Sequence, residues 1–256
     1  MTVRIEKRPG AERGSRTPEK IQSLSSGAIG TVTDAVKDAA GGAIRAVKPR
    51  LRGWIHAFTA PLALAACIVL TVLAPGPALT WACAAYLACS LFLFANSGVY
   101  HISYGHWPRR VTAVLQRVDH ANIYLLIAGT YTPLSVALLD RGMTLLVLGI
   151  VWGGALAGII TSLAWRSAPR WLTTLFYILL GWVAIWFLPQ FWMTGGPAIV
   201  WLLVSGGVVY TVGGAVYARR WPDPDPRWFG FHEIFHTCTV AAWACQCTAC
   251  YLAVLG

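Results

Sequence analysis

Charged side chains are scarce in this sequence. Asp, Glu, Lys and Arg make up 12% of the 256 residues, whereas hydrophobic residues make up 57%. Acidic residues are the scarcest, with 10 Asp and Glu against 20 Lys and Arg. This composition excludes an ordinary soluble domain and predicts an integral membrane protein. A basic excess can bind nucleic acid, but here the basic residues flank apolar segments, which indicates membrane orientation and no nucleic-acid partner.

The sequence also lacks the signs of a disulfide framework and of a cleavable signal peptide. All seven Cys residues lie in apolar segments, and an odd number does not favour pairing. Cys245 and Cys247 would project about 200° apart on a regular helix, so they cannot share a metal site. No apolar run follows the first charges within residues 1–28, so we expect a cytoplasmic tail rather than a signal peptide.

Two regions are expected along the chain. Residues 1–50 form a basic cytoplasmic tail that is disordered because it offers little apolar surface to bury. Within it, residues 29–48 repeat apolar side chains every three or four positions among basic ones, which fits either a helix on an anionic membrane surface or a solvated linker. Residues 51–256 form the transmembrane domain.

The transmembrane domain contains seven apolar segments, each of about 20 residues or more, the length that crosses a hydrocarbon core. Pro, Gly or charged residues separate the segments, and Trp and Tyr gather near their ends. The sequence therefore predicts an all-α integral membrane fold with seven transmembrane helices, at residues 54–73, 78–104, 120–139, 143–165, 171–191, 198–217 and 231–255.

The basic residues predict the orientation of these helices. Seven crossings place 19 of the 20 Lys and Arg residues on the side of the N-terminus and only Arg141 on the other side. Short cytoplasmic loops of membrane proteins are enriched in Lys and Arg. We therefore expect a cytoplasmic N-terminus, an external C-terminus and a multi-pass protein of the plasma membrane.

A pair of histidines stands at the start of the last segment. His232 and His236 are four positions apart, so on a helix their imidazoles share one face and can bind one metal ion. The alternative is that both rings lie at the membrane interface without a metal. His101, at the cytoplasmic end of the second segment, falls at the same depth and is the expected third ligand. Because histidines from separate segments fall at the same membrane depth, the sequence favours a zinc site.

Two further polar residues fall in this layer. Three His ligands leave the fourth position of zinc open to water, as in catalytic sites. Asp119 is then the expected general base, and Ser97 a hydrogen-bonding group near the water or the substrate carbonyl. The alternative to these catalytic roles is that Asp119 caps the third helix and that Ser97 packs between helices as a small residue. The remaining histidines are expected at the interface or behind the ligands: His56, His106 and His120.

Several of these residues lie in motifs that resemble a known family. The motifs are Ser97-x3-His101, Asp119-His120, the run Ile-Ala-Gly-Thr-Tyr-Thr-Pro at 127–133, and His232-x3-His236. Together they are similar to the haemolysin III family, which is related to the progestin and adipoQ receptors and more distantly to the alkaline ceramidases. The resemblance covers about residues 52–256. It implies seven helices and a cytoplasm-side zinc held by the three histidines, with Asp119 and Ser97 around its water.

These observations predict a zinc-dependent hydrolase of a lipid amide or ester, with membrane lipids as partners. One alternative is a receptor or membrane-homeostasis protein with structural zinc. Another is a cytolysin, which the bacterial family name implies but no repeated amphipathic pore segment supports. A fourth takes His-Glu-x-x-His as a metalloprotease motif with Glu233 as general base. No His, Asp or Glu follows His236, so that enzyme would need an upstream third ligand.

Overall fold

The computed structural model describes residue 49 and residues 51–165 and 169–256. Apart from one isolated bridge between Asp225 and Phe229, the regular structure of these residues is helical. The expected surface helix at 29–48 and nearly all of the expected tail lie outside the described residues, so both stay predictions.

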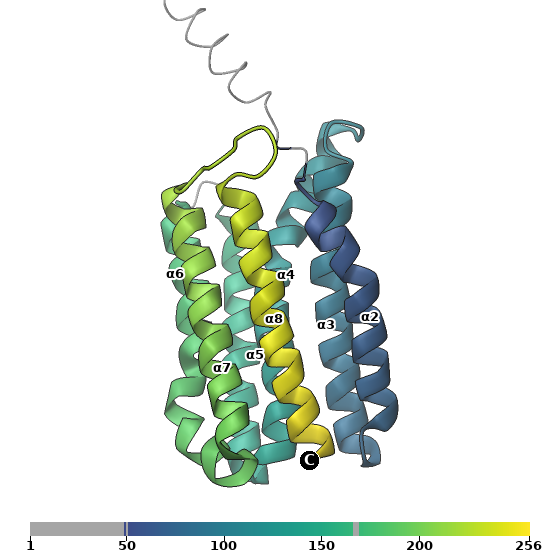
Figure 1. Cartoon of the computed structure of the whole chain (residues 1–256), viewed down its shortest axis with the longest axis vertical. Helices are drawn as coiled ribbons and strands as arrows, with labels where there is room; N and C mark the ends of the chain where they lie inside the picture. Colours follow the sequence, from purple (N-terminus) through teal and green to yellow (C-terminus); the bar gives the residue numbers. More distant parts are fainter. Residues whose placement is uncertain (1–48, 50, 166–168) are drawn as a thin grey trace, which may run out of the picture. The chain divides into compact units, whose positions relative to one another are not determined.

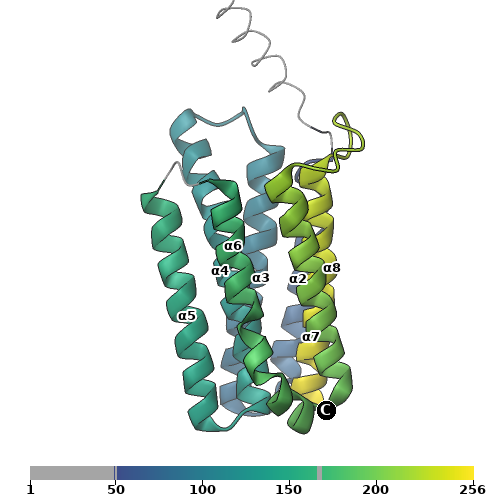
Figure 2. The same cartoon turned by 90° about the vertical axis from the view of Figure 1, so that its left-hand side faces the viewer.

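The helices form a bundle in which successive elements run up and down beside each other (Figures 1 and 2). Within the described residues, six helical runs are long and apolar enough to cross a membrane, with Arg170–Arg219 counted as one run. The elements are α2 (Trp54–Leu73), α3 (Gly76–Ile102), α4 (Arg109–Leu138), α5 (Arg141–Ala164), α6 (Arg170–Gly181), the 3-10 helix η1 (Trp182–Phe187), α7 (Leu188–Arg219) and α8 (Phe231–Leu255).

The run Arg170–Arg219 is a hairpin rather than a straight rod. Gly214, late in α7, packs against Thr174, early in α6. Between these positions lie η1 and Gly196, whose φ of 78° breaks the helical backbone and suits glycine. Figure 2 shows α6 descending to the end of the bundle where the C-terminus lies and α7 rising beside it.

The helix limits predicted from the sequence agree best with the structure at the two ends of the transmembrane domain. The first and last segments match α2 and α8. The third prediction is wrong at its start, because α4 begins at Arg109 rather than at residue 120. Hydropathy marks where a helix enters hydrocarbon, whereas α4 continues through a polar stretch beyond it. Pro108 precedes α4 and restricts the backbone just where the helix starts.

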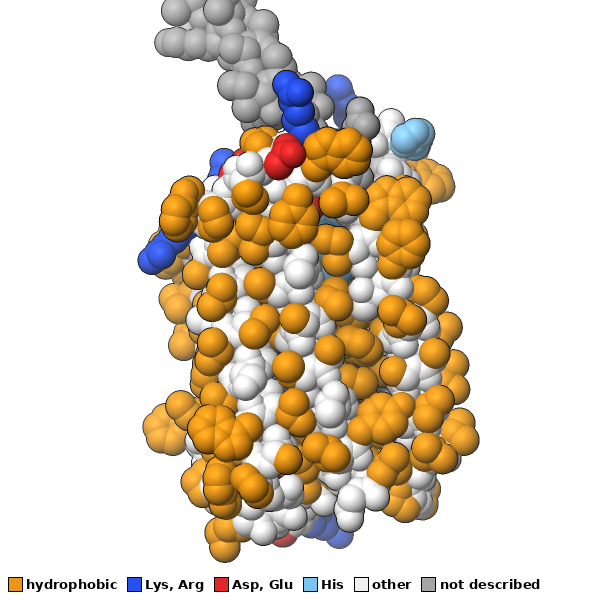
Figure 3. Space-filling model, in the orientation of Figure 1, with side chains coloured by type: hydrophobic (Ala, Val, Ile, Leu, Met, Phe, Trp, Pro, Cys, Tyr) orange, Lys and Arg blue, Asp and Glu red, His pale blue; other side chains and the backbone are white. Residues whose placement is uncertain are grey.

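The bundle surface suits a lipid environment. On the face shown in Figure 3, hydrophobic side chains cover the middle of the bundle, and charged side chains lie toward its two ends. Small residues let helices approach closely inside it. A Cβ on Gly98 of α3 would lie 3.1 Å from the Cα of Ala57 in α2, so these two backbones are in contact. This contact brings α2 against the part of α3 that carries Ser97 and His101.

Candidate metal centre

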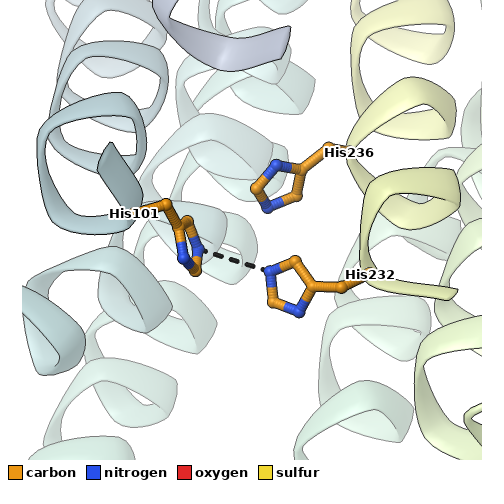
Figure 4. Close-up of side chains that lie close together, drawn as sticks. All are labelled: His101, His232 and His236. Atoms are coloured by element: carbon orange, nitrogen blue, oxygen red, sulfur yellow. Dashed lines mark hydrogen bonds between the residues drawn. The ribbon is translucent and has the colours of Figure 1, made fainter. Parts of the chain in front are cut away.

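Three histidine side chains converge at the end of the bundle where α8 begins. His101 comes from α3, and His232 and His236 come from the first turns of α8 (Figure 4). One ring nitrogen from each residue lies within 4.8 Å of the other two. The Nε2 atoms of His101 and His232 are 3.3 Å apart. The structure therefore brings together the three residues that the sequence predicted as ligands.

This geometry fits a tetrahedral metal ion. Nitrogens bound to zinc at 2.0–2.1 Å in tetrahedral geometry lie roughly 3.3 Å apart, and the His101–His232 pair has this separation. The third imidazole contributes a ring nitrogen within 4.8 Å of those of the other two. His236 is 2% exposed, and its Nδ1 atom is buried without a hydrogen-bond partner. A buried cluster of imidazoles that leaves a polar atom unsatisfied is the donor set that zinc prefers.

The residue between the two α8 ligands faces away from the cluster. Glu233 is 0% exposed, and its Oε2 atom accepts a hydrogen bond from the backbone N–H of Gly230 at 2.9 Å. Its Oε1 atom lies 2.8 Å from Nε of Arg52, just before α2. The carboxylate thus closes the first turn of α8 and is held by an arginine. Both oxygens are thus engaged, which argues against Glu233 as the general base of the metalloprotease alternative.

The segment before α2 also supports the third ligand. Gly53 has a φ of 91°, a left-handed conformation that disfavours other residues. A Cβ at this position would lie 2.8 Å from the Cβ of His101. Arg52 and Gly53 therefore contact both ligand-bearing helices, one through Glu233 on α8 and the other through His101 on α3.

Asp119 and Ser97 lie beside the histidines. The Oδ2 atom of Asp119 is 3.6 Å from Nε2 of His101. Ser97, one turn before His101 on α3, is 2% exposed, and both side chains line the same cavity. The alternative of Asp119 as a helix cap is wrong, because α4 starts at Arg109, well before it. A carboxylate in a helix interior beside three imidazoles is placed to orient a ligand or accept a proton.

His56 lies directly behind a candidate ligand, one of the two places that the sequence predicted for it. Its ring stacks on that of His236, with centroids 3.8 Å apart and planes at 10°. It is 3% exposed, and neither ring nitrogen has a hydrogen-bond partner. The only feature of the sequence that indicated this position was the membrane depth of His56, which lies at the start of α2. Of the other two histidines, His120 lines the cavity and His106 is exposed between α3 and α4.

The cluster opens into a cavity of about 320 Å³ inside the bundle. Along α8 the lining extends from His232 to Gln246, about 21 Å at 1.5 Å per residue. Apolar side chains such as Leu126, Ile127 and Phe235 share this lining with many polar ones, among them Thr130, Thr239 and Gln246. A long cavity whose surface is more apolar than polar, with the histidine cluster at one end, has room for a molecule with an alkyl chain and one reactive head.

Comparison with known proteins agrees with these features. The family model for haemolysin-III related proteins matches residues 44–247, which include all three candidate ligands. The chain belongs to the haemolysin III family. Together with its long apolar helices, this membership makes it a multi-pass membrane protein.

Two relatives give a measure of the similarity. The chain is 32% identical over 142 residues to the Hemolysin-3 homolog of Bacillus subtilis (strain 168), an alignment that covers 55% of this chain and 65% of that protein. It is 36% identical over 110 residues to Hemolysin-3 of Bacillus cereus, over 42% of this chain and 49% of that protein. The alignments thus span between about half and two thirds of these haemolysin III relatives.

Proposed function

We propose that this haemolysin III family protein is a zinc-dependent hydrolase that cleaves an amide or ester of a membrane lipid in the plasma membrane. One observation carries the proposal: three imidazoles converge beside a partly buried carboxylate at the end of a long cavity. The zinc ligands are His101, His232 and His236. When bound, zinc would polarise a carbonyl and lower the pKa of a coordinated water to about 7.

The chain's own residues supply the remaining steps. Asp119 accepts a proton at Oδ2 from the attacking water, whose oxygen bonds to the acyl carbon. The C–N or C–O bond then breaks, and the proton passes to the leaving amine or alcohol. Ser97 donates a hydrogen bond toward the acyl oxygen as negative charge develops on it. The apolar cavity holds the acyl chain and limits the entry of bulk water.

We further propose seven membrane crossings, with the N-terminus in the cytoplasm. The hairpin form of Arg170–Arg219 supports two crossings within this run, which at 50 residues is too long for one. The distribution of Lys and Arg supports the orientation, because only Arg141 falls on the side of the C-terminus. Reporter fusions at both ends test this arrangement, and a reporter that is active outside the cell at the N-terminus would overturn it.

Turnover of defined lipids tests the hydrolase directly. Purified protein, loaded with zinc in mixed micelles, is incubated with ceramides, N-acyl amines and acyl esters, and the released fatty acids are measured by mass spectrometry. We expect release from at least one lipid class, loss of release with a chelator, and recovery with added zinc. Zinc-loaded protein that cleaves none of these lipids would contradict the hydrolase.

The unsatisfied nitrogens of His56 favour a second candidate, a receptor or membrane-homeostasis protein with structural zinc. Rotation of His56 would supply a fourth nitrogen and close the site to water, as in structural zinc centres. In that case a chelator lowers thermal stability while no lipid is turned over. The relatives' name suggests cytolysis as well, but we expect erythrocytes exposed to the purified protein to stay intact.

A further inference from the structure

An arginine lies at the mouth of the cavity, close to the histidine cluster. Arg170 is the first residue of α6, and its side chain lines the cavity. Its Cζ atom lies 5.5 Å from the centre of the Tyr217 ring. The same ring lies 5.5 Å from that of His232. Tyr217 therefore lies near both the arginine and a candidate metal ligand, and all three side chains line the cavity.

Arg170 has no carboxylate partner among the described residues. The ion pairs found there, with a limit of 4.0 Å between nitrogen and oxygen, join Arg52 to Glu233 and His101 to Asp119. Arg170 is exposed, as are Arg219 and Arg220 at the same end of the bundle, but only Arg170 of these three lines the cavity. Among the described residues, its guanidinium therefore lies at the cavity mouth without a carboxylate within ion-pairing distance.

A second polar group lies one turn further along α6. Thr174 is 4% exposed and lines the cavity, and its hydroxyl has no hydrogen-bond partner. Thr130 and Thr239, which line the same cavity, each donate to the carbonyl four residues earlier, as helical threonines commonly do. The Thr174 hydroxyl is an exception to this pattern, so it remains available to a ligand. Positions 170 and 174 share one helical face.

The charges at the cavity mouth point to the kind of ligand. With a divalent ion on the three histidines, Asp119 supplies the only carboxylate in the cavity lining, and Arg170 adds a further positive charge. Positive charge is therefore in excess at this end of the cavity, where Arg170 is exposed at the mouth and a metal ion would lie further inside. The start of α6 adds the partial positive charge of a helix N-terminus. An anionic group on the ligand would offset this excess.

We propose that Arg170 and Thr174 form an anion subsite that binds the carboxylate or phosphate headgroup of an acyl lipid. The acyl carbonyl then lies at the histidine cluster, and the alkyl chain lies along α8. This inference rests on the proposed function and narrows its substrate class to lipids with an acidic group a few bonds from the acyl carbonyl. The guanidinium binds the anion by charge-assisted hydrogen bonds, and the threonine hydroxyl adds a neutral one.

A matched pair of ligands tests the subsite. N-oleoylglycine and N-oleoylethanolamine share the acyl chain and the amide, but the first ends in a carboxylate and the second in a hydroxymethyl group. Binding of each to zinc-loaded full-length protein is measured by titration in detergent micelles. We expect the wild type to prefer N-oleoylglycine by about 10-fold or more, the size of one charge-assisted interaction.

Three variants and one control test the contributions of Arg170 and Thr174 to ligand binding. We expect Arg170→Gln to weaken N-oleoylglycine binding by about 10-fold and to leave N-oleoylethanolamine binding unchanged, with zinc content intact. Arg170→Lys should recover part of the loss, and Thr174→Val should weaken N-oleoylglycine binding about 5-fold. Arg219→Gln, which removes an arginine at the same end of the bundle but outside the cavity, should behave as wild type.

The outcomes separate this inference from the proposed function. Equal binding of the two lipids, or equal loss in Arg170→Gln and Arg219→Gln, would overturn the subsite while lipid binding stands. Failure of the wild type to bind either lipid would overturn the subsite, and the proposed function falls with it only if ceramides and acyl esters are not cleaved either. Inorganic phosphate is the third probe. If it binds as tightly as N-oleoylglycine and depends on Arg170, the subsite takes a free anion, and the assignment to a lipid headgroup is wrong.

Discussion

Arg52 and Glu233 form an ion pair between two segments 181 residues apart in the chain, with Nε and Oε1 separated by 2.8 Å. The pair joins the turn before α2 to the first turn of α8, next to His232. A backbone hydrogen bond from the N–H of Leu51 to the carbonyl of Trp228, at 3.4 Å, runs alongside it. The start of the transmembrane domain therefore fixes the helix that supplies two of the three candidate ligands.

Removal of this arginine should destabilise the protein. Arg52→Ala leaves the carboxylate of Glu233 buried without its partner, and we expect a loss of about 2 kcal/mol or more in the free energy of unfolding. Unfolding in mixed micelles with increasing SDS measures the change. Arg227→Ala, at an exposed position between α7 and α8, is the control and should be neutral. An Arg52→Ala protein as stable as wild type would mean that water replaces the arginine at no cost.

Replacement of Glu233 by Gln tests whether this residue stabilises the start of α8 or acts as a general base. Gln keeps an oxygen for the N–H of Gly230 but cannot act as a base. We expect Glu233→Gln to lower stability while it retains most of the hydrolysis rate per zinc-loaded molecule. Rates measured on zinc-loaded fractions decide the matter. A rate that falls 100-fold or more with zinc still bound would restore the metalloprotease-like role for Glu233.

Gly53 should control the affinity for zinc through His101. Gly53→Ala introduces a methyl group 2.8 Å from the Cβ of His101, so that side chain has to shift. We expect the zinc dissociation constant to rise about 10-fold, as measured by competition with a chelator. Gly76→Ala is a matched control, because Gly76 also has a positive φ but no neighbour within 4 Å of an added Cβ. Equal effects of both changes would show that backbone strain, and not His101, is responsible.

His56 distinguishes the catalytic from the structural site. If three histidines bind the metal, His56→Ala should keep most of the zinc and lose only the stacking contact with His236. We expect this result, with zinc content above half of the wild-type value at saturating zinc. Metal analysis after dialysis measures it. Loss of zinc as complete as in His236→Ala would indicate a four-histidine structural centre.

Asp119 should affect hydrolysis more than metal binding. Asp119→Asn keeps the shape of the side chain but cannot accept a proton from the attacking water. We expect much of the zinc to remain and the lipid hydrolysis to disappear, since loss of a supporting group costs about 10–100-fold in metal affinity at most. Parallel measurements of zinc content and fatty-acid release test this. An Asp119→Asn protein without any zinc would make Asp119 a direct ligand and require a different mechanism.

The sequence predicted the histidine cluster because each member carried a local signal. His232 and His236 share a helical face by spacing alone, and the depth of His101 followed from the order of the apolar segments. The long apolar runs likewise predicted helices, since a chain in hydrocarbon has to satisfy its backbone hydrogen bonds internally. Features of this kind depend on periodicity and length, which the sequence displays directly.

Contacts between distant segments could not be predicted in this way. Nothing in the sequence pairs Arg52 with Glu233 rather than with water, because a polar side chain near a membrane surface can be solvated or buried. The stacking of His56 on His236 and the opening of Arg170 into the cavity depend on how helices rotate against each other. The polar start of α4 at Arg109 was missed because hydropathy does not mark the end of a helix that continues into water.

The zinc content of four purified proteins tests the central claim most directly: wild type, His101→Ala, His232→Ala and His236→Ala. Each is saturated with zinc, dialysed and analysed for metal per chain, with His106→Ala at an exposed position as control. The account predicts about one zinc ion per chain in the wild type and the control, and loss of most of it in each of the three variants. A His101→Ala protein that retains the full zinc content would contradict the three-histidine site.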